Sequence, residues 1–172
     1  TEHHLDLIDQ LLELPVDGIL LSDDWGYQHG VLIGAERWRK MLKPRLARLY
    51  QHVHDAGKIA LNHCCGSVAE IMPDLIEIGL DVLESVQPEA AGMNPYSLKK
   101  QYGKHITFWG GLGSQSIIPF GTPVELTAEI SKLAREMSVG GGYILAPAKD
   151  LQPGTPVENA AAIVETFIDL SD

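Results

Sequence analysis

A histidine and two cysteines stand together at His63-Cys64-Cys65, directly after the apolar run Ile59-Ala60-Leu61, and their side chains could do chemistry. Side chains two positions apart in a strand point to the same side, so His63 and Cys65 can approach one ion or one substrate, with Cys64 turned aside. Imidazole and thiolate bind zinc and also form nucleophilic sites. A zinc site needs three or four protein ligands, and His63 and Cys65 supply only two. The alternative is that Cys64 is buried, Cys65 is a loop thiol and His63 bonds to the backbone.

Five short apolar segments predict the strands that position this cluster. Each is continuously apolar rather than alternating, which is typical of a parallel sheet covered on both faces. The predicted strands are 18–22, 58–62, 81–85, 106–109 and 143–146. Helical patterns cover 4–14, 35–56, 68–78 and 96–102, and two more helices begin after residues 122 and 155.

Cap and breaker residues predict where these helices begin or bend. Pro44 lies inside the longest pattern and should kink or split that helix. Ser67, with Glu70 three residues later, predicts a capping box. Thr122 and Thr155 each precede a proline and an acidic first turn, so both are expected to be N-caps.

Strand, loop and helix repeated five times indicate βα units with right-handed crossovers. A barrel of eight such units needs about 250 residues, so a chain of 172 residues cannot close one alone. The fold class is therefore α/β, and the two architectures are an open doubly wound sheet or five units of a (β/α)₈ TIM barrel. We expect a single domain, 1–172, and its start at Thr1 without an initiator Met suggests a processed protein or a fragment.

Polar and glycine-rich sequence follows every predicted strand. In parallel α/β folds the carboxyl ends of the strands carry the chemistry, and a common pocket there favours the barrel. The five loops are 23–28, 63–66, 84–89, 110–115 and 146–150.

Three charged residues in these loops are candidates for catalysis or metal binding. Asp24 could act as an acid, a base or a hydrogen-bond acceptor, or serve only as an anion at a helix start. Glu84 could be a metal ligand or a base, or a paired charge. Lys149 would be a strong cation in an acidic protein, or a solvated surface lysine.

Five further residues are candidates for substrate binding. Trp25 and Tyr27 could form a flat wall, or pack in the core. Gln87 and Gln115 add polar side chains to two of the loops. Gly111, with its neighbouring glycines, allows close backbone approach to a carboxylate or phosphate, although glycines are also common in plain turns.

The charge balance narrows the range of partners. Thirteen basic against 23 acidic residues give a net charge of −10, which argues against nucleic acid and anionic membranes. An anionic substrate would need only a local positive pocket. No apolar run approaches the roughly 18 residues of a membrane span. Two cysteines without a disulfide framework fit a reducing compartment, so we expect a cytoplasmic protein.

Taken together, the loops resemble the uroporphyrinogen decarboxylase superfamily of (β/α)₈ barrels. This superfamily includes the haem-pathway decarboxylase and zinc-dependent methyltransferases that serve corrinoid proteins. The chain resembles the carboxyl-terminal five βα units of such a barrel. The matching segments are 24–26 followed by 37–44, 63–66, 110–111 with 119–123, and 140–142 through 153–159.

The methyltransferase branch of that superfamily implies zinc as cofactor and a corrinoid protein as partner. Its zinc ligands are a His-x-Cys pair and a later cysteine, and the zinc activates a substrate thiol. His63 and Cys65 match the pair, whereas the later cysteine aligns with Lys149. Either Glu84 completes the site, or no zinc binds.

Two other functions stay open. A tetrapyrrole decarboxylase would need no cofactor; the family's serine at the position of Asp24 and its histidine at the position of Lys149 are both absent here. Five βα units leave an open sheet edge and an exposed interior face. A non-catalytic binding module would associate through them, with a second copy or with a partner that supplies the missing strands.

Overall fold

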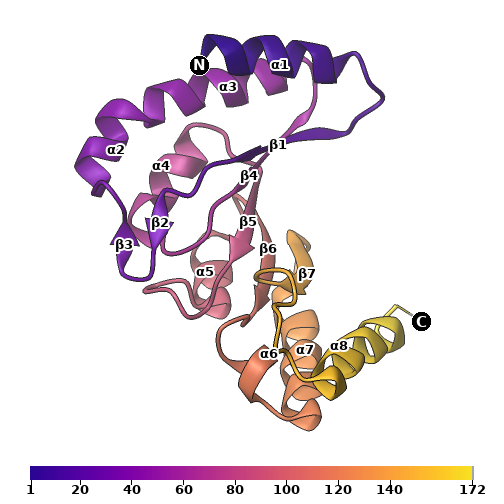
Figure 1. The fold of residues 1–172 in the computed structure, drawn as a ribbon. Coiled ribbons are helices and arrows are strands. Elements are labelled where there is room, and N and C mark those ends of the chain that lie inside the picture. Colours follow the sequence, from indigo (N-terminus) through magenta and orange to yellow (C-terminus); the bar gives the residue numbers. More distant parts are fainter. Residues whose placement is uncertain (172) are drawn as a thin grey trace.

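The computed structural model describes residues 1–171 and is built around one parallel sheet (Figure 1). Its five strands follow the order β1-β4-β5-β6-β7, and each pairs in parallel with its neighbours. The strands are β1 (Gly18–Ser22), β4 (Ile59–His63), β5 (Val82–Val86), β6 (Thr107–Leu112) and β7 (Tyr143–Pro147). All five predicted strands and the five βα units are thus confirmed.

One helix precedes β1, and the other helices lie between or after the strands of the sheet. They are α1 (Glu2–Leu12), α2 (Ala35–Met41), α3 (Lys43–Asp55), η1 (Ala69–Ile71), α4 (Met72–Glu77), α5 (Pro95–Tyr102), α6 (Ile117–Phe120), α7 (Pro123–Met137) and α8 (Val157–Asp169). No helix within residues 1–171 combines the length and the apolar character needed to span a bilayer.

Helices cover one face of the sheet, and several apolar residues of the other face are exposed, as expected for five βα units of a barrel and contrary to the expectation of two covered faces. Ile19 and Phe108 face the helices and are 5% and 0% exposed. On the other face, Leu20, Ile59 and Ile144 are 48%, 45% and 40% exposed. A continuous apolar run does not indicate which of its residues pack against a helix. The strands were therefore predicted as buried on both faces.

The start of two helices is confirmed in detail. Pro44 separates α2 from α3, since the helix breaks between Met41 and Lys43. Thr122 and Glu125 form a reciprocal capping box at the start of α7. This box satisfies backbone N–H groups that would otherwise be unpaired in the first turn.

Two other predicted caps were wrong. The hydroxyl of Ser67 donates to the carbonyl of Ala91, and the chain forms the short turn η1 before α4. The hydroxyl of Thr155 donates to the carbonyl of Gln152, and α8 begins without a side-chain cap. In both cases the hydroxyl donates to a loop carbonyl, and its oxygen accepts no hydrogen bond from the first turn of the helix.

A hairpin that the sequence did not predict links β1 to α2. Its strands, β2 (Gly26–Tyr27) and β3 (Gly30–Val31), are two residues each and antiparallel. The backbone of Gly26 lies against the loop after β4, because a Cβ at Gly26 would be 2.6 Å from the carbonyl oxygen of Cys65. The backbone N–H of Ser67 donates to Tyr27 O at 2.8 Å. The hairpin therefore holds the loop that follows His63.

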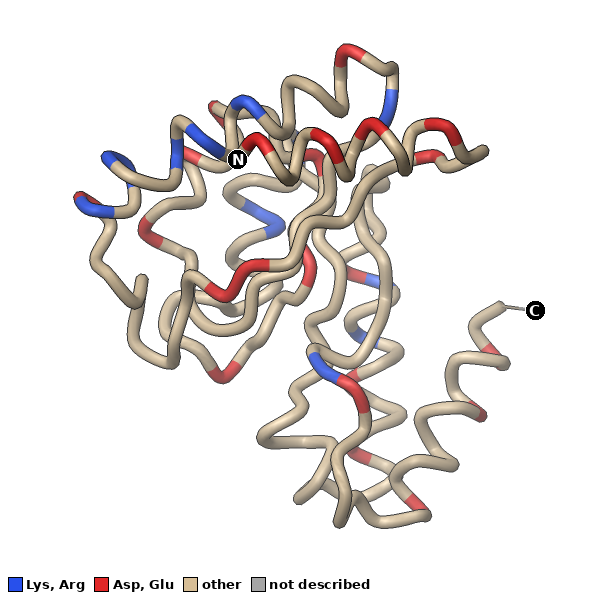
Figure 2. Tube along the Cα trace, turned by 45° about the horizontal axis from the view of Figure 1, so that its top comes forward, with Lys and Arg blue, Asp and Glu red and all other residues tan. Residues whose placement is uncertain are grey.

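Charged residues are sorted along the helices. Figure 2 shows acidic positions repeating along α1 and basic positions along α2 and α3. Arg39 and Lys43 both bond to the buried carboxylate of Asp74 on α4, at 2.9 and 2.8 Å. Burial alone would raise the pKa of Asp74, but these two hydrogen bonds outweigh it and hold the pKa below its usual value.

Candidate functional site

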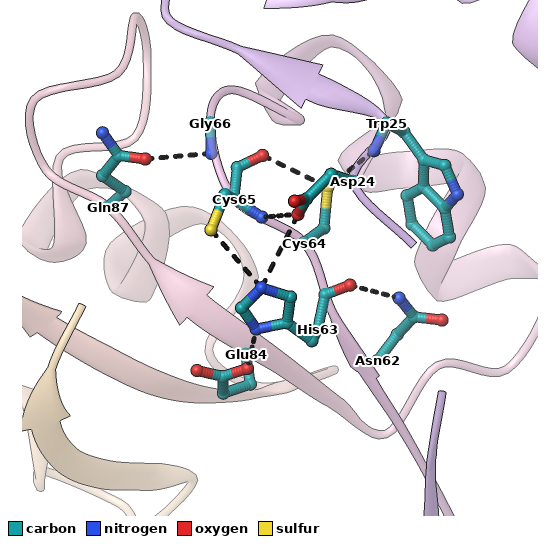
Figure 3. A network of polar contacts seen from close by, with 9 residues as sticks. All are labelled: Asp24, Trp25, Asn62, His63, Cys64, Cys65, Gly66, Glu84 and Gln87. Atoms are coloured by element: carbon teal, nitrogen blue, oxygen red, sulfur yellow. Dashed lines mark hydrogen bonds and ion pairs between the residues drawn. The ribbon is translucent and has the colours of Figure 1, made fainter. Parts of the chain in front are cut away.

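Three side chains bring potential metal ligands together at the carboxyl ends of β1 and β4 (Figure 3). Asp24 lies in the loop after β1, His63 ends β4, and Cys65 follows it by two residues. The Nε2 atom of His63 is 3.3 Å from the sulfur of Cys65 and 3.6 Å from Oδ1 of Asp24. One ligand atom from each residue lies within 4.8 Å of the other two. Oxygen, nitrogen and sulfur thus converge on one point.

Glu84 lies on the opposite side of the imidazole. It is in register with His63 across β4 and β5, and its carboxylate contacts Nδ1 of His63. A carboxylate on Nδ1 fixes the ring and leaves Nε2 free for a ligand. We expected Glu84 to be a metal ligand, but the structure puts its carboxylate behind the histidine and puts Asp24 beside the cysteine.

Asp24 is held in place by the backbone of the same loop. Its Oδ1 accepts a hydrogen bond from the backbone N–H of Cys65 at 2.7 Å. The neighbouring Asp23 contributes its backbone N–H to the carbonyl of His63 at 3.2 Å instead. Of the two aspartates, only Asp24 is part of the cluster.

The two cysteines have opposite environments. Cys64 is fully buried, its sulfur accepts the backbone N–H of Trp25 at 3.2 Å, and burial raises the pKa of Cys64 to about 12. Cys65 is partly exposed on the other side of the chain. The prediction that Cys64 points away from the side of His63 and Cys65 is therefore confirmed, and Cys64 behaves as a core residue.

The electrostatic environment of Cys65 includes both acidic neighbours and Lys149. Burial raises the pKa of the Cys65 thiol, and the charges of Asp24 and Glu84 raise it further. The charge of Lys149 acts in the opposite direction and lowers that pKa. Lys149, in the loop after β7, is therefore close enough to influence the cluster, whose remaining charges are negative.

A chain of glutamines continues from the cluster across three loops. Gln87 accepts the backbone N–H of Gly66 and donates to Gln28, both at 3.0 Å. Gln28 in turn donates to Gln115 at 2.5 Å. Gln87 and Gln115 were predicted as substrate-binding residues, and the structure joins them through Gln28. Sequence reasoning gave Gln28 no role, although it shares a loop with Asp24.

The remaining predicted substrate-binding residues lie in different surroundings. Trp25 is 5% exposed and packs edge-to-face on Trp38, with ring centroids 5.6 Å apart. Tyr27 is 46% exposed on the hairpin. Gly111 is buried on the helical side of β6, since a Cβ there would lie 3.3 Å from the hydroxyl of Tyr143 and 3.5 Å from Leu133.

A family model described as Uroporphyrinogen decarboxylase (URO-D) matches residues 1–169. The chain belongs to this family. The resemblance drawn from the loop motifs is therefore confirmed, and with it the assignment to the superfamily that contains the corrinoid methyltransferases.

Two curated relatives of the chain carry a methyltransferase name. Methylcobamide:CoM methyltransferase MtaA of Methanosarcina barkeri is 28% identical over 167 residues, covering 95% of this chain and 45% of that protein. MtaA of Methanosarcina barkeri strain Fusaro is 30% identical over 136 residues, covering 77% of this chain and 36% of that protein. The chain thus spans about half the length of these relatives or less.

A solved structure gives the same result for the fold. A methyltransferase from Methanosarcina mazei superposes with a TM-score of 0.73 at 25% identity, over 99% of this chain and 47% of that chain. The parallel sheet with alternating helices is therefore the α/β fold that we predicted, five consecutive βα units of a URO-D-like (β/α)₈ TIM barrel.

Proposed function

We propose that this URO-D chain is part of a methyltransferase that moves a methyl group between a corrinoid protein and a thiol. The observation that carries this proposal is the convergence of Asp24, His63 and Cys65 on one point. The names of the two MtaA relatives, which specify methylcobamide and CoM, support the same reaction class.

The three side chains fit a zinc ion of the catalytic kind. Such sites use three protein ligands drawn from nitrogen, oxygen and sulfur and keep a further position open. Asp24, His63 and Cys65 offer one atom of each kind, and Glu84 supplies the carboxylate that usually supports a ligating histidine. Zinc in this position lowers the pKa of a thiol that binds to it, which creates the nucleophile.

The residues of the chain have separate tasks in this proposal. Glu84 holds His63 in the tautomer whose Nε2 is unprotonated. Cys65 must lose its proton to bind a cation, and Asp24 and Lys149 act on its pKa in opposite directions. Lys149 also attracts the anionic end of a substrate into a site that is otherwise negative. The amide groups of Gln28, Gln87 and Gln115 can position this substrate.

The metal content of the purified protein tests this proposal. We expect one zinc per chain, measured by mass spectrometry of the elements after dialysis, and its loss in Cys65→Ser. Cys64→Ser is the matched control, because it removes the other thiol and should keep the metal. A protein that takes up no zinc when the metal is supplied in excess would contradict the proposal.

Methyl transfer is then assayed directly. The spectrum of methylcobamide should change when the zinc-loaded protein and CoM are added together, and Cys65→Ser should abolish the change. Because the chain spans about half of the MtaA relatives, this assay is run on the longest natural form of the protein.

A tetrapyrrole decarboxylase is the second candidate, and the description of the family model favours it. The carboxylates of Asp24 and Glu84 at the site act against it, because uroporphyrinogen itself carries many carboxylates. Release of carbon dioxide from uroporphyrinogen by the metal-free protein would establish this activity in place of methyl transfer.

The exposed face of the sheet supports a third proposal, that the chain associates with a second copy. Leu20, Ile59 and Ile144 expose apolar surface on one face, and β1 and β7 each have an unpaired edge within the described residues. Light scattering should show a dimer or larger species, and a uniform monomer would contradict this proposal.

A further inference from the structure

A second concave site lies at the other end of the sheet from Cys65. A cavity of about 1130 Å³ opens beside Ile106, Thr107 and Gly142, the residues that begin or precede β6 and β7. Residues of α5 and of the carboxyl-terminal end of α7 form its sides. Because the strands are parallel, this cavity is at their amino ends, a sheet length away from the candidate metal ligands.

The lining of this cavity is rich in unpaired positive charge. Lys99, Lys100 and Lys104 line it, and none of them forms an ion pair within residues 1–171. Its two carboxylates are both engaged, because Glu136 pairs with Arg135 at 3.3 Å and Asp81 with His54 at 2.8 Å. Three uncompensated ammonium groups around one cavity are unexpected in a chain with a net charge of −10.

Lys99 is fixed at the inner side of the cavity. Its ammonium donates to the carbonyl of Gly141, and partial burial lowers the pKa of Lys99 without any carboxylate to oppose the effect. An anion beside this ammonium would restore the solvation that burial removes. An anionic ligand therefore gains more binding free energy beside the Lys99 ammonium than beside a fully exposed lysine.

The glycine run 140–142 keeps this side of the cavity open. All three residues have positive φ angles of 77°, 78° and 68°, a conformation that glycine adopts readily. A Cβ at Gly140 or Gly141 would meet no atom within 4 Å, so the turn presents bare backbone to open space. Close approach of a ligand to the backbone is thus unobstructed.

An apolar surface completes the cavity. Val139 is 72% exposed beside the buried Met137, and the ring of Tyr96 lies under the ammonium of Lys132 at 4.1 Å. The hydroxyl of Tyr96 is anchored on Glu129 at 2.7 Å, which fixes the ring. The cavity therefore offers a flat apolar contact next to its cationic side.

We propose that this cavity binds a phosphate-bearing small molecule of nucleotide size. Lys99, Lys100 and Lys104 contact the phosphates as point charges, and the surface of Tyr96 and Val139 takes the apolar part. The cavity, at about 1130 Å³, lies just above the range of about 300–1,000 Å³ that is typical of small-molecule pockets, so it has room for a nucleotide. The cavity is separate from the proposed metal site, so the binding does not depend on the proposed function.

Calorimetric titration of the purified protein with ADP, and separately with inorganic pyrophosphate, tests this proposal. We expect millimolar or tighter binding of ADP at about 0.1 M salt, where the Debye length is about 10 Å, and weaker binding of pyrophosphate, which lacks the apolar part. The double variant Lys100→Gln/Lys104→Gln should weaken binding about tenfold or more, as expected for the loss of two charged contacts. Circular dichroism of each variant verifies that it is folded.

The matched control is Arg37→Gln/Lys40→Gln, which removes two positive charges on α2 outside the cavity. Its affinity for ADP should stay within about twofold of the wild type, since exposed charges beyond a Debye length are screened. Equal weakening in both double variants would mean nonspecific attraction and would overturn the proposal. Absence of binding at millimolar ADP, or preference for a poly-glutamate peptide over ADP, would overturn it as well.

Discussion

The two ends of the same sheet carry opposite chemistry. At the carboxyl ends, Asp24 and Glu84 surround His63 and Cys65, and Lys149 is the cation that acts on the thiol. At the amino ends, unpaired lysines surround a cavity whose carboxylates are already bound to other groups. The net charge of a chain therefore says little about the charge of a site, because each end of a parallel sheet collects its own set of loops.

Removing the negative charge of the Asp24 carboxylate should have the largest effect on the carboxyl-end site. We expect Asp24→Asn to weaken zinc binding by more than about a hundredfold, beyond the range of residues that only support a ligand. Asparagine keeps an oxygen that can accept the N–H of Cys65, so the loop should stay in place. Competition with a chelating dye measures the affinity. Asp23→Asn is the control, and an equal loss in that variant would show that general charge, rather than coordination, is responsible.

Glu84→Gln should have a smaller effect at the same site. A residue that orients a ligating histidine typically contributes about tenfold to a hundredfold to metal affinity, and Glu84 contacts only the Nδ1 side of His63. The same dye competition measures this change. A loss greater than that of Asp24→Asn would mean that Glu84 is the third ligand after all, as the sequence alone suggested.

The ion pairs of Asp74 with Arg39 and Lys43 should affect the stability of the fold but not ligand binding at either end of the sheet. Asp74→Asn removes the charge that Arg39 and Lys43 share, and we expect a loss of about 1 to 2 kcal/mol in the free energy of unfolding at neutral pH. Because the pKa of Asp74 is depressed in the folded state, its contribution is complete above the unfolded pKa of about 3.9 and disappears as the pH falls through the folded value.

Urea unfolding at neutral and at strongly acidic pH measures this difference. The gap between wild type and Asp74→Asn should close in acid. A gap that is the same at both pH values would contradict the assigned role of the carboxylate. Zinc affinity and ADP affinity should be unchanged in this variant.

The smallest expected effect is that of Lys149 on the thiol. Lys149→Gln should raise the pKa of Cys65 and slow its alkylation by iodoacetamide about twofold to threefold at mildly alkaline pH, in metal-free protein. Cys64 is fully buried and should not react. Lys104→Gln makes the same charge change at the amino-end cavity. If it slowed alkylation as much as Lys149→Gln, the two ends would not be electrostatically separate.

The sequence predicted the order of the elements because apolar runs and cap residues are local signals. Thr122 and Glu125 are three residues apart, and their capping box formed as expected. The hairpin at Gly26 was missed because each of its strands has only two residues. The exposure of Leu20 on one sheet face agrees with the expectation that five βα units alone leave an interior face uncovered, whereas the apolar run by itself predicted a buried strand.

Two members of the candidate metal site, His63 and Cys65, were predicted as ligands, whereas Asp24 was predicted as a catalytic residue and Glu84 as the third ligand. His63 and Cys65 could be paired from the two-residue period of a strand. Whether Asp24 or Glu84 lies on the Nε2 side of the ring depends on the register between neighbouring strands and on the loop after β1. Neither can be derived from one sequence. The amino-end cavity was missed entirely, since its lysines are ordinary surface residues until α5 and α7 are placed together.

X-ray absorption at the zinc edge of the metal-loaded protein tests the central claim most directly. Coordination by Asp24, His63 and Cys65 predicts a single sulfur ligand at about 2.3 Å, with the remaining ligands nitrogen or oxygen at about 2.0 to 2.2 Å. The sulfur signal should persist in Cys64→Ser, whereas Cys65→Ser should retain no zinc. Two sulfur ligands, or none, in the unmodified protein would contradict the account.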